Sequence, residues 1–238
     1  ATVMAQMTVA AAIAHQEADH WTHHLRDTIQ SGQGLCNEKL SYQLCKNAPR
    51  KILEMRDWKT DWANDNARIR QVLAPGHEVK RCCYVDFLST GPAVARTLRG
   101  EVAKHKNIKR ISGITIIDLV VKKSRVVGAI GLHTETGDFV SFAAKAVVLA
   151  AGGLTQLFSR NSASKNMGGD SHALALRAGA NLIDMEFVQF FPIGHLAPRL
   201  VGMDPIMWDP FRYKLGGKLL NGQGCLLYTS PSPRDEQS

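Results

Sequence analysis

KAVVLAAGG, residues 145–153, is the stretch that decides the fold class of this 238-residue chain. Its apolar run is continuous rather than alternating, which is typical of a strand buried on both faces of a parallel sheet. Two glycines follow at the carboxyl end, where ligands bind in open α/β sheets and where a backbone without Cβ approaches a phosphate or ring closely. A glycine pair after a strand is also a common turn, so this motif alone leaves both interpretations open.

The residues around this segment alternate between strand and helix patterns. Before it, period-two patterns predict short strands over 113–122, 125–134 and 138–142, joined by turns. After it, we predict a helix over 169–178 that closes at Gly179, and then a strand over 181–188. This order predicts an α/β fold that binds a nucleotide.

The N-terminal half is predicted to be mainly helical. Apolar spacing predicts helices over 19–30, 37–57 and 91–105. Asn37 can cap the second helix, which Pro49 is expected to break or kink. Residues 58–79 show no regular pattern. The pair Cys82 and Cys83 is expected to lie half-buried in a strand, with a redox-active pair as the alternative.

A carboxylate begins the helix predicted after the glycine pair. The sequence NMGGDSHALALRAG, residues 166–179, places Asp170 directly behind a glycine-rich turn. A carboxylate at this position can cap the helix and interact favourably with its dipole. It can also accept hydrogen bonds from a sugar or ribityl hydroxyl.

Composition and charge exclude several classes of protein. Hydrophobic residues make up 45% of the chain and charged residues 21%, as in an ordinary globular protein. No apolar run approaches the ~20 residues of a membrane-spanning helix. The net charge is +8, but the basic cluster at 104–110 lacks a nucleic-acid-binding motif, so we expect no nucleic-acid partner. The five cysteines form no CxxC pair, which favours a reducing compartment.

Three histidines share one predicted helix. His20, His23 and His24 have a spacing that occurs in metal sites. A zinc site needs further ligands and an outer shell that orients them, and histidines on a helix more often face solvent. We therefore expect no metal.

Taken in order, the motifs resemble the FAD-dependent oxidoreductase 2 family, and within it the flavoprotein subunits of succinate dehydrogenase and fumarate reductase. The central match is LAAGG at 149–153, followed by GD to RAGA at 169–180 and DMEFVQFFPIG at 184–194. Further matches are TVMAQ at 2–6, the D-x-W-x-x-H-x-x-D-T pattern at 19–28, TGPA at 90–93 and GGKLLN at 216–221.

This resemblance implies FAD as the cofactor and assigns residues to it. The flavin ring would be lined by Thr2, Ala5 and Gln6. The phosphates and ribityl chain would lie beside Ala151, Gly152 and Gly153, with Asp170 holding the flavin side and the backbone of 114–119 near the adenine. The G-x-G-x-x-G fingerprint of the family is absent from this chain. The histidine that binds FAD covalently in some members would fall at Ala1, so we expect non-covalent FAD.

The substrate region departs from the family pattern. Phe191 and Ile193 stand where the family has a histidine and a threonine near the substrate carboxylate. Each lost hydrogen bond to a charged group is worth roughly 1.5–3 kcal/mol. Basic residues nearby could bind an anion instead, or simply carry surface charge: His195, Arg199, Arg212 and Lys214. The family's catalytic arginine would lie downstream of Gly224.

From the resemblance we expect an FAD-binding Rossmann-like domain, incomplete, with an inserted β-meander and the start of a capping domain. Residues 1–189 would form the FAD-binding domain, without its dinucleotide fingerprint, and residues 190–224 would begin the substrate or capping domain. Residues 225–238 resemble a translated sequencing adapter and are expected to be a cloning scar.

The expected activity is hydride transfer between flavin and a small anionic substrate. Two alternatives stay open: a related flavoenzyme of the adenylylsulfate-reductase or aspartate-oxidase type, and a non-catalytic flavoprotein-like subunit. The resemblance implies an iron–sulfur electron-transfer subunit as partner. It also implies a cytoplasmic location, peripheral at the inner membrane through partner subunits. We expect the isolated chain to bind FAD poorly and to be inactive.

Overall fold

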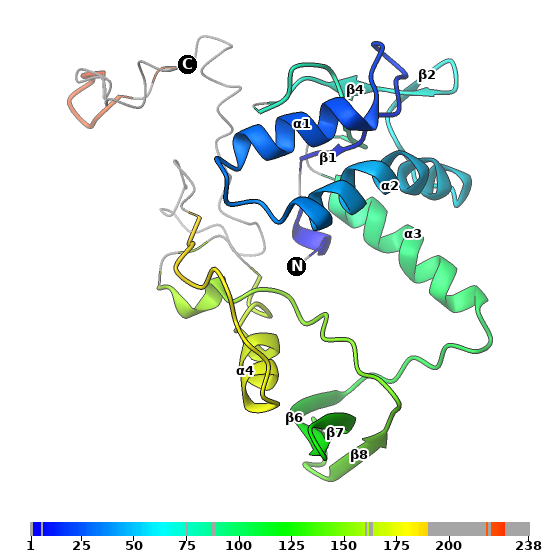
Figure 1. The fold of residues 1–238 in the computed structure, drawn as a ribbon, viewed down its shortest axis with the longest axis vertical. Coiled ribbons are helices and arrows are strands. Elements are labelled where there is room, and N and C mark those ends of the chain that lie inside the picture. Colours follow the sequence, from blue (N-terminus) through cyan, green and yellow to red (C-terminus); the bar gives the residue numbers. More distant parts are fainter. Residues whose placement is uncertain are drawn as a thin grey trace. The chain divides into compact units, whose positions relative to one another are not determined.

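The structure is a computed structural model that describes residues 2–5, 7–74, 76–86, 89–159, 161, 164–189, 218 and 220–226. The chain divides into two units, one formed by residues 1–157 with 163–181 and the other by 158–162 with 182–238. All helices and strands named below belong to the first unit (Figure 1). In the second unit, Leu220 and Leu226 form an isolated antiparallel bridge.

Three long helices confirm the N-terminal predictions within about two residues of each boundary. They are α1 (Trp21–Ser31), α2 (Glu38–Asp57) and α3 (Thr90–Lys104). The side chain of Asn37 caps α2 by accepting a hydrogen bond from the N–H of Leu40 at 3.2 Å. Helices α1 and α2 pack against each other, and the rings of Trp21 and Tyr42 meet edge to face.

Of the break or kink expected at Pro49, the break is wrong, because α2 continues through this residue. A proline inside a helix removes one hydrogen bond and costs about 3 kcal/mol. The turns on both sides offset that cost by burial: Ile52 belongs to the hydrophobic core, and Ala48 packs against it. Tertiary packing thus outweighs local propensity in α2.

Residues 58–79 contain short strands that the sequence pattern did not predict. The strands β1 (Val9–Ala10), β4 (Gln71–Val72) and β5 (Cys82–Cys83) form one antiparallel sheet in the order β1-β5-β4. Strands β2 (Asn64–Asp65) and β3 (Arg68–Ile69) form a hairpin. Two-residue strands are too short to show a period of two, which explains why residues 58–79 read as irregular.

The strand prediction for the two cysteines is confirmed, but both side chains are fully buried rather than half-buried. Cys83 is 0% exposed and belongs to the hydrophobic core. Burial raises the pKa of the Cys83 thiol to about 12. A thiol held in this way is protonated and unreactive, which argues against a redox-active pair. The other members of the core are Ala11, Ile52, Trp62 and Ile69.

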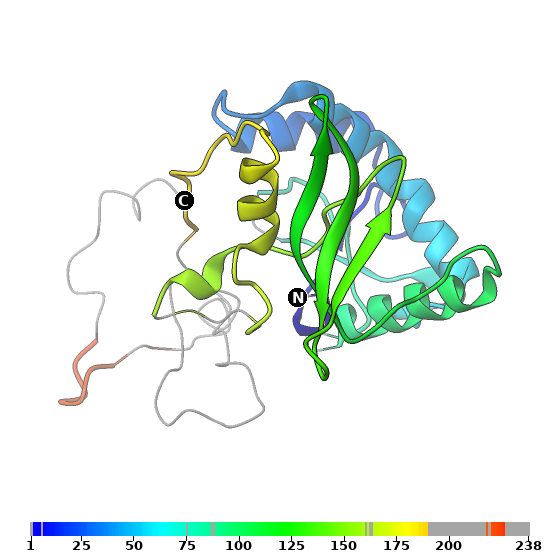
Figure 2. The ribbon, with the colours of Figure 1, turned by 90° about the horizontal axis from the view of Figure 1, so that it is seen from below.

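A three-stranded antiparallel sheet confirms the second group of predicted strands. Its strands are β6 (Ile114–Lys122), β7 (Arg125–His133) and β8 (Phe139–Ala143), in the order β6-β7-β8. Figure 2 shows the sheet with α4 (Asp170–Arg177) beside it. The guanidinium of Arg177 donates to the carbonyl oxygen of Ile117 at 2.7 Å and pairs with Asp118, which joins the end of α4 to β6.

The buried parallel strand predicted over 145–151 is wrong, as is the strand predicted over 181–188. Both segments lack regular structure, and Val148 is 88% exposed. A strand is stable only when a neighbour takes up its backbone hydrogen bonds. Among the described residues, no strand lies beside 145–151 to do so.

The hairpin between β2 and β3 carries avoidable backbone strain. Its two turn residues, Asn66 and Ala67, both have positive φ, at 49° and 67°. This is the two-residue turn that favours Asn-Gly, because an alanine in the left-handed region costs roughly 1–2 kcal/mol.

Replacing Ala67 with glycine is therefore expected to raise the free energy of unfolding by about 1 kcal/mol. Urea denaturation of the complete protein measures the change. Ala95→Gly, inside α3, is the control and should lower stability by about 1 kcal/mol, because glycine is a poor helix former. Equal effects of the two substitutions would contradict the strain at Ala67.

A buried cluster of charges joins α1 to the segment before β5. Arg81 is 0% exposed, and its guanidinium donates two hydrogen bonds to Asp19, at 3.0 and 3.1 Å, and one to Asp27 at 2.5 Å. The rings of His24 and His77 meet edge to face with their centroids 5.6 Å apart, and Arg81 also contacts His77. Nδ1 of His24 is buried and has no hydrogen-bond partner among the described residues.

This environment makes stability depend on pH. Burial above all, and the charge of Arg81, lower the pKa of His24 to about 4. In the unfolded chain this histidine titrates at about 6.5, so the unfolded state binds more protons than the folded state between those two values. The contribution of His24 to stability is present above pH ~6.5 and is lost as pH falls toward 4.

The variant His24→Gln is expected to reduce the slope of unfolding free energy against pH between about 6.5 and 4. Chemical denaturation at a series of pH values checks this. His23→Gln is the matched control, because the His23 side chain is 53% exposed one position away. A slope unchanged by His24→Gln would show that other groups set the acid sensitivity.

Candidate cofactor site

The first part of the site is the segment Thr2 to Met7, held against the start of α3. Thr2 and Ala5 are both exposed, and the N–H of Ala5 donates to the carbonyl of Thr2 at 3.0 Å. The N–H of Gly91 donates to the carbonyl of Ala5 at 2.8 Å. The first N–H groups of a helix have no partner within the helix. The N–H of Gly91 can therefore hold the N-terminal segment.

The absence of a side chain at Gly91 makes this contact possible. A Cβ there would lie 2.1 Å from the carbonyl oxygen of Thr2 and 2.3 Å from that of Ala5. Both obstacles are backbone atoms, so the helix and the segment could not keep their present separation with a larger residue. The start of α3 therefore fixes where the exposed side of the segment lies.

The second part of the site is the glycine pair after residues 145–151. Gly152 has a φ of 86°, a conformation that glycine adopts without steric cost. The carbonyl of Gly153 accepts a hydrogen bond from the N–H of Gly169 at 3.1 Å, and Gly169 also has positive φ, at 87°. A Cβ on Gly153 would lie 3.0 Å from Cε of Met167. Two glycine-rich turns therefore pack backbone to backbone, and Ala151 and Gly152 stay exposed.

Asp170 lies where the sequence predicts it, as the first residue of α4. Gly169 occupies the N-cap position, so the carboxylate of Asp170 does not cap the helix. Asp170 is exposed, and among the described residues no hydrogen bond or ion pair engages its carboxylate. It is therefore available to a ligand at the positive end of the helix dipole.

Three residues near the glycine pair were not singled out from the sequence. The hydroxyl of Ser171 accepts a hydrogen bond from the N–H of Ala151 at 3.1 Å, which links α4 to the glycine turn. The hydroxyl of Thr155 and Nδ1 of His172 are buried and have no hydrogen-bond partner among the described residues. All three lie within two positions of Gly153 or Asp170 in the sequence, and this proximity is the signal that could have identified them.

The remaining predicted site residues are not tested by this geometry. Gln6, and the substrate-region residues Phe191, Ile193, His195 and Arg212, lie outside the described residues. Within the part of the chain that the structure describes, no three His, Cys, Asp or Glu side chains are placed to hold a metal ion. In the same residues, no helix is both long and apolar enough to cross a membrane.

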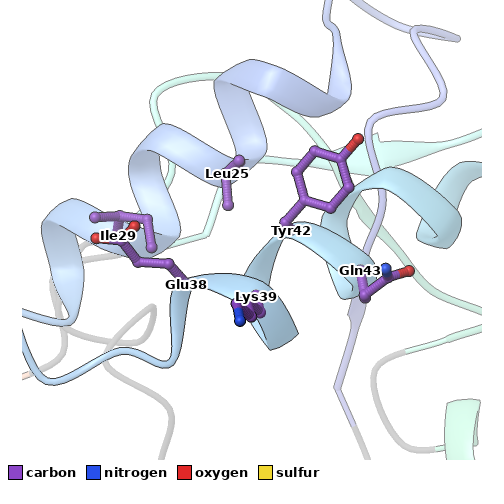
Figure 3. A pocket seen from close by; sticks show the side chains of 6 residues that line it. All are labelled: Leu25, Ile29, Glu38, Lys39, Tyr42 and Gln43. Atoms are coloured by element: carbon purple, nitrogen blue, oxygen red, sulfur yellow. The ribbon is translucent and has the colours of Figure 1, made fainter.

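A groove lies apart from the predicted residues, between α1 and α2. It measures about 420 Å³, and Figure 3 shows the side chains that line it: Leu25, Ile29, Glu38, Lys39, Tyr42 and Gln43. None of the residues assigned to the cofactor from the sequence lines this groove. We assign it no role in the cofactor site.

The residues predicted to hold the cofactor lie on glycine-rich turns, at the acidic start of a helix and on an N-terminal segment that hydrogen-bonds to α3. A family model described as "FAD binding domain" matches residues 1–226. The chain therefore belongs to the FAD-binding-domain family, and FAD is its cofactor.

The chain is similar in sequence to two curated proteins and in structure to a solved complex. The chain is 31% identical over 202 residues to the succinate dehydrogenase flavoprotein subunit of Rickettsia bellii, a match covering 81% of this chain and 34% of the relative. It is 32% identical over 181 residues to L-aspartate oxidase 2 of Ralstonia nicotianae, covering 76% and 33%. A chain of the Mycobacterium smegmatis Sdh1 complex superposes with a TM-score of 0.86 at 33% identity, covering 99% of this chain and 41% of that chain. The match therefore spans about a third to two fifths of each of these proteins.

The residues present are suited to FAD. The exposed backbone at Gly152, with no Cβ, leaves room for a phosphate or ribityl chain to approach. The free carboxylate of Asp170 is a hydrogen-bond acceptor for hydroxyl groups. The unpartnered hydroxyl of Thr155 and ring nitrogen of His172 are polar groups that a bound ligand or water would satisfy.

Proposed function

We propose that this chain is the flavin-holding part of an FAD-dependent oxidoreductase that transfers a hydride between the flavin and a small anionic substrate. The observation that carries the proposal is the exposed Asp170 at the start of α4, beside the Gly152–Gly153 turn, whose carboxylate has no partner in the described part of the chain. FAD supplies the redox chemistry when it is bound, and the protein supplies position and electrostatics. The length of the relatives supports a longer polypeptide as the active form.

Each part of the site has a distinct task in this proposal. Asp170 accepts hydrogen bonds from the cofactor's hydroxyl groups, and the Gly152–Gly153 backbone approaches its phosphates. Thr2 and Ala5 lie against the flavin ring with Gln6, and α3 holds this segment in place. The alanine at position 1 offers no side chain for a covalent link, which supports non-covalent FAD.

Asp170→Asn is expected to raise the dissociation constant of FAD about 10- to 100-fold, because it replaces a charged hydrogen-bond acceptor with a neutral amide that has only one accepting oxygen. Flavin fluorescence titration of the complete protein measures the change. Asp65→Asn in the β2–β3 hairpin is the control, since this exposed residue lies outside the site, and it should bind FAD normally. Normal FAD binding by Asp170→Asn would remove the main support for the proposal.

A second candidate substrate class is an amino acid, as for an aspartate-oxidase-like enzyme. Two observations favour it: the similarity to L-aspartate oxidase 2, and the replacement of the family's polar pair by Phe191 and Ile193. Anaerobic mixing of the flavoprotein with succinate or L-aspartate distinguishes the two, because only a true substrate bleaches the flavin absorbance. A flavin that neither substrate reduces, and that passes no electrons to fumarate, would favour a non-catalytic subunit.

The proposed partner is an iron–sulfur electron-transfer subunit. The similarity to a succinate dehydrogenase flavoprotein subunit supports it, since that relative's name identifies it as part of a larger enzyme. Such a partner would place the protein in the cytoplasm, at the periphery of the inner membrane. Co-purification of the complete protein with an iron–sulfur polypeptide tests this.

A further inference from the structure

The buried hydroxyl of Thr90 contacts the same N-terminal segment that Gly91 holds. Thr90 is the first residue of α3 and is 3% exposed. Its Oγ1 lies 2.6 Å from the carbonyl oxygen of Met7 and 3.0 Å from that of Asp86. The N–H of Val85 donates to the same oxygen at 3.2 Å. One hydroxyl therefore joins three segments of the chain.

This hydroxyl has no role in capping its own helix. The N-cap residue of α3 is Ser89, and no side chain makes a cap hydrogen bond there. A hydroxyl has a single proton to donate. Given to the nearer acceptor, the Met7 carbonyl at 2.6 Å, that proton ties α3 to the N-terminal segment. Thr90 and Gly91 thus bind the carbonyls of Met7 and Ala5, the two described residues on either side of position 6.

We propose that Thr90 is a positioning residue for the flavin: its hydroxyl fixes the Met7 carbonyl and thereby sets the face that Thr2 to Met7 presents to the ring. This inference rests on the proposed function, in which that segment lines the flavin. Thr90 does not touch the cofactor. A displacement of the segment by a fraction of an ångström alters the contacts that tune the flavin.

The test compares Thr90→Val with Thr60→Val in the complete flavoprotein. Valine keeps the shape of threonine and removes only the hydroxyl. Thr60 is a suitable control because it is also buried and its hydroxyl donates to Thr97 at 2.9 Å, and no hydrogen bond among the described residues joins its side chain to the N-terminal segment. Thr90→Ser keeps the hydroxyl and serves as the conservative variant. Thr90→Ala makes the same deletion if the valine variant does not fold.

We expect Thr90→Val to weaken FAD binding at least tenfold and to shift both the flavin absorption spectrum and its midpoint potential, and Thr90→Ser to restore all three. Thr60→Val should lower the melting temperature to a similar extent and leave the flavin unchanged. A Thr90→Val protein with wild-type affinity, spectrum and potential would overturn this inference alone. A wild-type protein that binds no FAD would overturn the proposed function and this inference with it.

Discussion

Replacing Arg81 with methionine is expected to lower the free energy of unfolding by about 3–5 kcal/mol, the largest stability effect anticipated for a single residue here. The guanidinium is fully buried and is the partner of two carboxylates, Asp19 and Asp27, whose side chains are only 1% and 3% exposed. Methionine fills most of the volume but leaves two negative charges in a site that excludes water. Thermal and urea denaturation of the complete protein measure the loss.

Two further variants separate this charge effect from packing. Arg56→Met removes an exposed ion pair with Asp57, outside the cluster, and should cost less than about 1 kcal/mol. Asp27→Asn in the Arg81→Met background should recover part of the lost stability, because it removes one uncompensated charge. A loss below 1 kcal/mol for Arg81→Met would mean that water reaches the cluster.

Gly91→Ala is expected to have the largest effect on function, with flavin reduction slowed by about 10²-fold. The new Cβ would meet the carbonyl oxygens of Thr2 and Ala5 at distances that real structures do not show, so the segment or the helix must move. Overpacking of this kind also costs about 1–3 kcal/mol of stability. Stopped-flow reduction of the flavin and a melting curve measure the two consequences.

The same helix supplies the control for this substitution. Gly100 also lies inside α3, but a Cβ there meets nothing within 4 Å. Gly100→Ala should raise stability by about 1 kcal/mol and leave flavin reduction unchanged, because alanine is the better helix former. Similar kinetics for the two alanine variants would show that the contact between α3 and residues 2–5 does not matter for the cofactor.

Sequence patterns predicted the helices and strands that form because of residues close to one another in the chain. The helices α1 to α4 follow from apolar spacing and capping residues such as Asn37, which act within a few positions. The β6–β7–β8 sheet follows from period-two patterns and tight turns, including Lys123 and Ser124 with positive φ. The position of Asp170 as the first residue of α4 was predicted for the same reason.

The features that were predicted wrongly or missed depend on residues far apart in the sequence. The apolar run at 145–151 carries the pattern of a buried strand, but a strand also requires a neighbour that the pattern cannot supply. The ion pairs of Arg81 join residues more than 50 positions apart, and nothing near Arg81 in the sequence indicates its partners. The contacts of Thr90 and Gly91 with residues 2–7 are equally distant in sequence.

The full burial of Cys83 makes this residue a reporter of how often the domain opens. Its strand, β5, pairs with β1, which directly follows the segment assigned to the flavin. Because its thiol is inaccessible and protonated, an alkylating reagent reacts with it only during transient opening. Ligand that binds only the closed state lowers the open population by a factor of 1 + [L]/Kd. The alkylation rate of one cysteine, followed by mass spectrometry, would therefore give the occupancy of the cofactor site without using the colour of the flavin.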